Sequence, residues 1–265
     1  MNTIKNKAVS IVQEASKNTK KISSKELLSY YENQAEEMPL FGSLREISLA
    51  ENVIAAFPLS FQSVIDVGSG EGFLLAEIRK KYPSATITGF DISKKRLLQT
   101  KQHVPTALLA RGDVLKLPFQ DNSFDVVVCS ELLEHIDAYQ AVAEELFRIA
   151  KKQIIITVPY EQELITVTCP KCQAHHYLDG HVNTFTEKKL RSLLETKQNI
   201  SAKTKKFHSI YTYNRLTLKL PLFLRLFFES VVLRFHTTIT FLKPNYLLMS
   251  IEKRQSSERI PYEKI

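Results

Sequence analysis

Residues 64–72 read Val64-Ile65-Asp66-Val67-Gly68-Ser69-Gly70-Glu71-Gly72, a short apolar run that passes into alternating glycines. The apolar start predicts a buried strand, and the glycines predict a sharp turn whose backbone a ligand can approach closely. A second apolar run, residues 85–90, ends in the carboxylate of Asp91. Because open α/β folds bind ligands at the carboxyl ends of parallel strands, this pattern predicts a nucleotide site at that edge of a sheet.

The charge of the turn indicates which nucleotide fits. A dinucleotide fingerprint reads G-x-G-x-x-G and directs backbone N–H groups at a pyrophosphate. Here the glycines alternate, and the carboxylates of Asp66 and Glu71 flank them. Negative charge repels a pyrophosphate but attracts a sulfonium and an α-amino group. The turn therefore favours S-adenosylmethionine over NAD, with Asp91 as the acceptor for the ribose hydroxyls.

Four further segments follow this turn in order: 89–93, 111–114, 117–128 and 131–136. With them, residues 60–160 resemble the class I (Rossmann-like) S-adenosylmethionine-dependent methyltransferases, of the methyltransferase type 11 kind. In this resemblance, residues 131–136 match the family's helix after the fourth strand. The resemblance implies that Asp91 holds the ribose and that Asp113 contacts the adenine amino group. The residues expected at the cofactor are Asp66, Gly68, Gly70, Gly72, Asp91, Ile92, Asp113, Val114 and Ser130. An unrelated α/β domain and a relative without catalytic activity stay open as alternatives.

Apolar runs and helical periodicity predict an α/β fold, a doubly wound, mostly parallel seven-stranded sheet with helices on both faces. The expected strands are 63–67, 85–90, 107–111, 124–129, 153–158, 200–213 and 245–253. The expected helices are 44–57, 71–81, 93–103, 138–150 and 187–196, with two more before residue 39. The domain division is 1–60 for an N-terminal helical extension, 61–160 for the cofactor-binding core, 161–185 for an insertion and 186–265 for the C-terminal part. The resemblance suggests that the helical extension lies across the cofactor cleft.

The insertion carries Cys169-Pro170-Lys171-Cys172, followed by His175, His176 and His181. Two cysteines and later histidines at this spacing are typical of tetrahedral zinc sites. A subset of the family resembled here carries a similar insertion, and the expected ligands are Cys169, Cys172, His181 and one of the two neighbouring histidines, taken as His176. Four protein ligands would make a closed, structural site. A redox Cys-x-x-Cys and a segment without metal are the alternatives.

Methyl transfer requires the acceptor atom to be held in line with the methyl group, and a hydroxyl acceptor also requires a base. We expect the acceptor to lie over Ser130, Glu131 and His135, at the end of the fourth strand. His135 is the candidate base by position, although a capping or packing role is an equal alternative. Asp137 and Tyr160 are weaker candidates.

Composition limits the partners. The chain has 265 residues, 44% hydrophobic and 24% charged, with a formal net charge of +8. The basic residues are scattered in pairs without interleaved aromatic residues, which argues against a nucleic-acid groove. The Cys129-Ser130-Glu131-Leu132 stretch also lacks the Asn/Asp-Pro-Pro-Tyr pattern of methyltransferases that act on amino groups. An RNA-directed methyltransferase nevertheless stays the alternative function.

Residues 221–235 form an apolar segment interrupted by Arg225, Glu229 and Arg234, so no stretch is long enough to span a membrane. Packing on the core or on a homodimer face is one interpretation, and an apolar acceptor cover or a peripheral membrane contact is the other. The second favours a small, apolar or lipid-like acceptor. Separately, we expect the methyl group to be transferred to an oxygen atom. Three cysteines and the absence of an apolar leader after Met1 predict a cytoplasmic protein, monomeric or homodimeric.

Overall fold

The computed structural model describes residues 43–168, 175–208 and 244–253. The helices expected before residue 39 and the apolar segment 221–235 therefore lie outside the described residues. None of the helices in the described ranges combines the length and apolar character needed to cross a bilayer.

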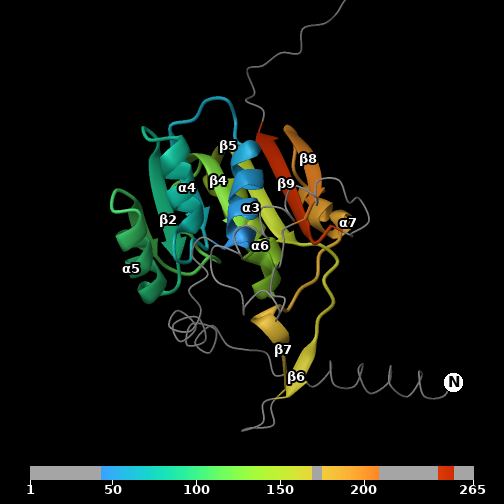
Figure 1. Cartoon of the computed structure of the whole chain (residues 1–265). Helices are drawn as coiled ribbons and strands as arrows, with labels where there is room; N and C mark the ends of the chain where they lie inside the picture. The colour runs from blue at the N-terminus through green and yellow to red at the C-terminus, as the bar shows by residue number, and fades with distance from the viewer. Residues whose placement is uncertain (1–42, 169–174, 209–243, 254–265) are drawn as a thin grey trace, which may run out of the picture.

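Seven strands form one sheet in the order β3-β2-β1-β4-β5-β9-β8 (Figure 1). Each of the first five strands in this order runs parallel to its neighbour, whereas β9 is antiparallel to both β5 and β8. This arrangement confirms the predicted seven-stranded, mostly parallel sheet. The strands are β1 (Ser63–Val67), β2 (Thr86–Asp91), β3 (Leu108–Arg111), β4 (Phe124–Ser130), β5 (Ala150–Pro159), β8 (Ile200–Phe207) and β9 (Tyr246–Lys253).

The helices cover both faces of the sheet, as the pattern predicts. They are α3 (Leu44–Ala55), α4 (Phe73–Lys81), α5 (Lys94–His103), α6 (Tyr139–Ile149) and α7 (Glu187–Arg191), with 3-10 turns η1 (Leu133–His135), η2 (Leu178–Gly180) and η3 (Ser192–Leu194). Two expectations were wrong in detail. Segment 131–136, matched to a helix, contains only the turn η1, and the helix expected over 187–196 changes to η3 after Arg191.

Neighbouring residues of each strand contribute to two different cores. Ile65 and Val127 pack in a cluster with residues of α6, whereas Val64 and Val126 pack in a second cluster with residues of α3 and α4. Successive side chains of a strand point to opposite faces, so an unbroken apolar run covers both sides of the sheet. The sheet is thus buried on both faces, which leaves the carboxyl ends of its parallel strands for ligands.

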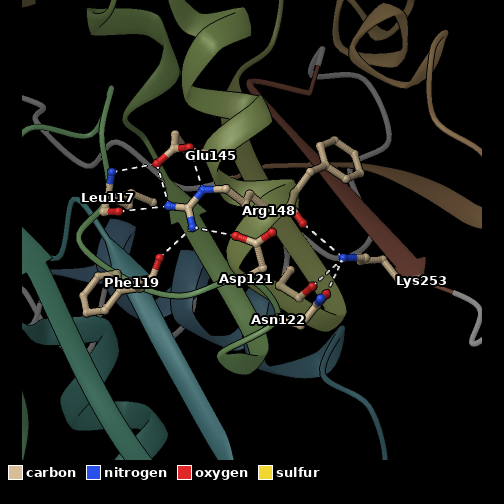
Figure 2. A network of polar contacts seen from close by, with 9 residues as sticks. Leu117, Phe119, Asp121, Asn122, Glu145, Arg148 and Lys253 are labelled. Atoms are coloured by element: carbon tan, nitrogen blue, oxygen red, sulfur yellow. Dashed lines mark hydrogen bonds and ion pairs between the residues drawn. The ribbon is translucent and has the colours of Figure 1, made fainter.

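Arg148 of α6 fixes the loop that leads into β4 (Figure 2). Its guanidinium donates to the carbonyl oxygens of Leu117 at 2.9 Å and Phe119 at 2.6 Å. It also pairs with the carboxylates of Asp121 at 3.0 Å and Glu145 at 2.8 Å. Charge-assisted hydrogen bonds of this planar group order the loop against α6.

The predicted insertion contains a two-stranded antiparallel sheet, β6 (Thr166–Thr168) with β7 (His175–Tyr177). In Figure 1 this hairpin lies below the main sheet. Cys169 and Cys172 fall between the two strands, outside the described residues. The zinc site therefore stays a prediction, as does the division into domains.

Candidate active site

The glycine turn after β1 is tied to the end of β2. The backbone N–H groups of Gly68 and Ser69 donate to Phe90 O at 2.8 and 3.0 Å. Gly68, Gly70 and Gly72 all have positive φ, at 85°, 54° and 83°. A Cβ on Gly72 would lie 2.6 Å from Cγ2 of Thr100, closer than packed atoms allow. Glycine is therefore required here both for the backbone conformation and for the approach of α5.

Asp91 joins this turn to β2. Its Oδ2 accepts from Gly70 N at 2.9 Å and its Oδ1 accepts from Ser93 N at 2.8 Å, with the side chain buried. Burial raises the pKa of this carboxyl, while the two backbone donors oppose the rise. Each carboxylate oxygen has a further lone pair, so Asp91 can still accept from the hydroxyls of a ribose.

Asp66 supplies a second buried carboxylate beside the first. It is 3% exposed, and its Oδ1 has no hydrogen-bond partner among the described residues. Burial, and then repulsion by Asp91, raise the pKa of Asp66 to about 7. An unpaired buried carboxylate is costly unless a donor or a cation compensates it. The pair of acids beside the glycine turn thus fits a positively charged nucleoside, as S-adenosylmethionine is.

The end of β3 lies next to this acid pair. Gly112 N donates to Asp91 O at 3.2 Å, which brings Asp113 and Val114 to the same edge of the sheet. Asp113 is exposed and accepts from Leu115 N at 2.9 Å, whereas Val114 is buried. Ile92, between β2 and α5, is partly buried. All nine predicted cofactor residues thus lie on β1, β2 and β4 or in the segments that follow β1, β2 and β3, and their contacts with the cofactor stay a prediction.

The end of β4 forms the opposite side of the candidate site. Ser130 Oγ lies 2.8 Å from Thr157 Oγ1, which donates to Glu131 Oε1 at 3.2 Å. Glu131 Oε2 accepts from Arg45 Nη2 at 3.0 Å, and Arg45 Nε donates to the Tyr246 hydroxyl at 2.7 Å. Side chains from α3, β5 and β9 therefore hold one carboxylate at this edge. The contact places the first turn of α3 over the end of β4.

Glu131 is conformationally and electrostatically unusual. Its φ is 54°, a left-handed conformation that non-glycine residues rarely adopt. Such strained residues cluster at functional sites, where the surrounding structure holds them in place. Burial raises its pKa to about 7, although Arg45 opposes the rise. A carboxylate with this pKa is suited to accept a proton near neutral pH.

His135, the base predicted from its position, lies beside His181. The two ring centroids are 4.5 Å apart, edge to face. Burial, then the neighbouring His181, lower the pKa of His135 to about 3. The imidazole is neutral and weakly basic at neutral pH, so Glu131 is the better placed base.

The sequence did not predict two groups of residues that lie together near the end of β4. Arg45 and Tyr246 contact the site, and the only local signal for Arg45 was its place in the first turn of a helix capped by Ser43. The buried carboxylate of Glu134 lies near both His135 and His181. Of the predicted zinc ligands, His176 pairs with Val167 in the β6–β7 hairpin and His181 is buried near His135.

Comparison with known proteins gives a family and several relatives. A family model described as a methyltransferase domain matches residues 60–215, more than half of the chain. The ubiquinone/menaquinone biosynthesis C-methyltransferase UbiE of Desulfotalea psychrophila is 33% identical over 94 residues, which cover 33% of this chain and 37% of that protein. A sterol 24-C-methyltransferase of Gibberella zeae is 34% identical over 94 residues, 33% of this chain and 24% of that protein. The chain thus matches less than half the length of these relatives.

A solved structure shares the fold over a greater length. The putative methyltransferase in complex with the Trm112 methyltransferase activator of Haloferax volcanii superposes with a TM-score of 0.62. The superposition covers 89% of this chain and 100% of that one, at 18% sequence identity. At this identity the likeness shows the fold alone.

Proposed function

The chain belongs to the class I S-adenosylmethionine-dependent methyltransferases, and from this we propose that it transfers a methyl group from S-adenosylmethionine to a small apolar acceptor. The observation that carries the proposal is the buried acid pair of Asp66 and Asp91 beside the glycine turn, which matches a cationic adenosyl donor. The relatives' names support the acceptor class, since they refer to quinone biosynthesis and to sterols.

The residues of the donor side have separate tasks. Asp91 would accept from the ribose hydroxyls while Gly70 N keeps its carboxylate in place. Asp66 would face the positive charge of the donor, and Asp113 would contact the adenine amino group. When bound, S-adenosylmethionine supplies a methyl group on a positively charged sulfur, so that the leaving group is neutral.

The acceptor side must hold the acceptor atom in line and take its proton. We assign Glu131 as the base that removes this proton, because Arg45 and Thr157 position its carboxylate at the end of β4. The sequence favours an oxygen as the acceptor atom, whereas the relatives are named C-methyltransferases. Either atom loses a proton on methylation, so both fit a carboxylate base at this position.

The insertion adds a separate proposal, a structural zinc ion held by Cys169, Cys172, His176 and His181. Its support is the ligand spacing. In the structure, His181 Nδ1 lies 2.6 Å from Gln162 Oε1, so His181 would bind such an ion through Nε2.

The test is transfer of an isotope-labelled methyl group from S-adenosylmethionine to fractions of a cell extract. We expect label in the organic-solvent fraction with the wild-type chain and its loss with Asp91→Asn. NMR of the purified product then distinguishes O-methylation from C-methylation. Label in RNA instead, with activity that falls steeply as salt rises, would favour the RNA-directed alternative. A chain that binds no donor would be a relative without catalytic activity.

A further inference from the structure

A second cluster of potential ligands lies beside the acceptor edge. Glu134 and His135 belong to η1, directly after β4, and His181 follows η2 at the return from the insertion. One potential ligand atom from each of these three residues lies within 4.8 Å of the others. His181 is thus brought next to two residues, His135 and Glu134, that precede it by 46 and 47 positions in the sequence.

Backbone hydrogen bonds hold the two segments together. Val182 N and Asn183 N both donate to Glu134 O, at 2.8 and 3.0 Å. The side chain of Asn183 donates to Ile136 O at 2.8 Å. His181 is therefore fixed against η1 by its neighbours in sequence, and the convergence of the three side chains belongs to the folded core.

The Glu134 carboxylate gives an independent indication of a ligand. Its side chain is 1% exposed, and neither carboxylate oxygen has a hydrogen-bond partner among the described residues. Buried carboxylates are ordinarily paired, hydrogen-bonded or bound to metal, so a cation is the partner that this geometry lacks.

In both imidazoles Nδ1 lies next to an oxygen acceptor. His135 Nδ1 lies 3.3 Å from Gly180 O, and His181 Nδ1 lies 2.6 Å from Gln162 Oε1. A carbonyl oxygen only accepts, so each Nδ1 carries the hydrogen and each Nε2 carries the lone pair. In metal-binding histidines, the N–H of the other ring nitrogen typically donates a hydrogen bond to a carbonyl or carboxylate oxygen, which fixes the tautomer and the ring orientation.

We propose that Glu134, His135 and His181 bind one divalent first-row transition-metal ion at the acceptor edge of the sheet. Two imidazole nitrogens and one carboxylate oxygen suit Zn²⁺, Mn²⁺ or Fe²⁺ better than Mg²⁺, which prefers oxygen ligands. Three protein ligands leave a coordination position open, as in catalytic rather than structural sites.

The position of the ion gives it a role that rests on the proposed function. Glu134 lies three residues after Glu131, the base assigned to the acceptor. An oxygen of the acceptor in the open position would lose its proton more readily, because a bound cation stabilises the resulting anion. Binding of the metal itself does not depend on this role.

The experiment is titration of the metal-stripped, full-length chain with Zn²⁺, Mn²⁺ and Mg²⁺ by calorimetry, with Co²⁺ as a spectroscopic probe. We expect one transition-metal ion per chain, visible ligand-field bands with Co²⁺, and weaker binding of Mg²⁺. Glu134→Gln keeps the shape of the side chain and should weaken binding at least about 100-fold, as should His181→Ala. Asp137→Asn, a change of an exposed carboxylate nearby, should leave binding unchanged.

The lone pair of His181 Nε2 can bind only one ion, so this site and the Cys/His zinc site exclude each other, and variants of the insertion distinguish them. The double variant Cys169→Ser/Cys172→Ser should retain the ion if Glu134 is a ligand. Loss of binding in this double variant together with full binding in Glu134→Gln would overturn the proposal, as would a wild-type chain that binds none of these ions.

Donor binding makes the result independent of methyl transfer. Glu134→Gln should still bind S-adenosylmethionine as tightly as the wild type, which also shows that the variant is folded. A chain that binds the metal but transfers no methyl group would contradict the proposed function and leave the metal site standing. Activity that survives in Glu134→Gln together with unchanged metal affinity would overturn the metal site alone.

Discussion

Replacing Asp66 with asparagine should stabilise the protein at alkaline pH while it weakens donor binding. The pKa of Asp66 rises from 3.8 to about 7 in the folded state, because the carboxyl is buried and lies near Asp91. A group whose pKa is raised by folding stabilises the folded state below its unfolded pKa, and this stabilisation is lost as pH rises through the folded pKa. The rise corresponds to about 4 kcal/mol against the ionised form.

The assay is urea unfolding of the wild type and Asp66→Asn at about pH 5 and about pH 8. Part of the loss is already present at the lower pH, since the unfolded carboxyl ionises near pH 4. Between the two conditions the free energy of unfolding of the wild type should therefore fall by about 3 kcal/mol more than that of the variant. Other buried acids, such as Glu131, are present in both proteins and largely cancel in the difference.

A matched control tests the cause. Asp113→Asn removes an exposed carboxylate at the same edge and should follow the wild-type pH profile to within about 0.5 kcal/mol. If the free energies of unfolding of the wild type and Asp66→Asn changed in parallel from acid to alkaline pH, Asp66 would not be the carboxylate with a raised pKa that the account places at the donor site.

Three further outcomes follow from the same contacts. Gly72→Ala should lower the free energy of unfolding in urea by about 1–3 kcal/mol, because the new Cβ would lie 2.6 Å from Thr100. Gly70→Ala is the control, since Gly70 also has positive φ but its nearest contact is 3.7 Å. An equal loss in Gly70→Ala would contradict the steric cause. Arg148→Leu should lose about 2 kcal/mol as the loop before β4 is released from α6, and a loss below about 0.5 kcal/mol would show that the network in Figure 2 is not stabilising. Arg45→Ala should move the rising limb of the pH–rate profile to higher pH, because loss of the guanidinium raises the pKa of Glu131 further, and an unmoved limb would exclude Glu131 as the base.

The parallel half of the fold was readable from the sequence because local patterns determine it. Unbroken apolar runs such as 126–128 mark strands buried on both faces, and the glycine turn with Asp91 marks the carboxyl edge where they end. The main error lay after β4, where a helix was matched to 131–136. The left-handed conformation of Glu131 interrupts regular structure there, and no residue type signals it.

The acceptor side depends on contacts that no local pattern contains. Arg45 meets Glu131 across 86 residues and Tyr246 across 201 residues. His181 was read with the preceding cysteines, because ligand spacing along the chain was the only available signal. Its packing against His135 follows from the return of the chain to η1, which only the folded structure shows.

Calorimetric titration of the full-length chain with S-adenosylmethionine tests the central claim most directly. The account predicts one donor per chain, with Asp91→Asn at least about tenfold weaker because the ribose loses a charged acceptor. A wild-type chain that shows no binding, or an Asp91→Asn variant that binds as tightly as the wild type, would contradict the assignment of the glycine turn and its acid pair as the donor site.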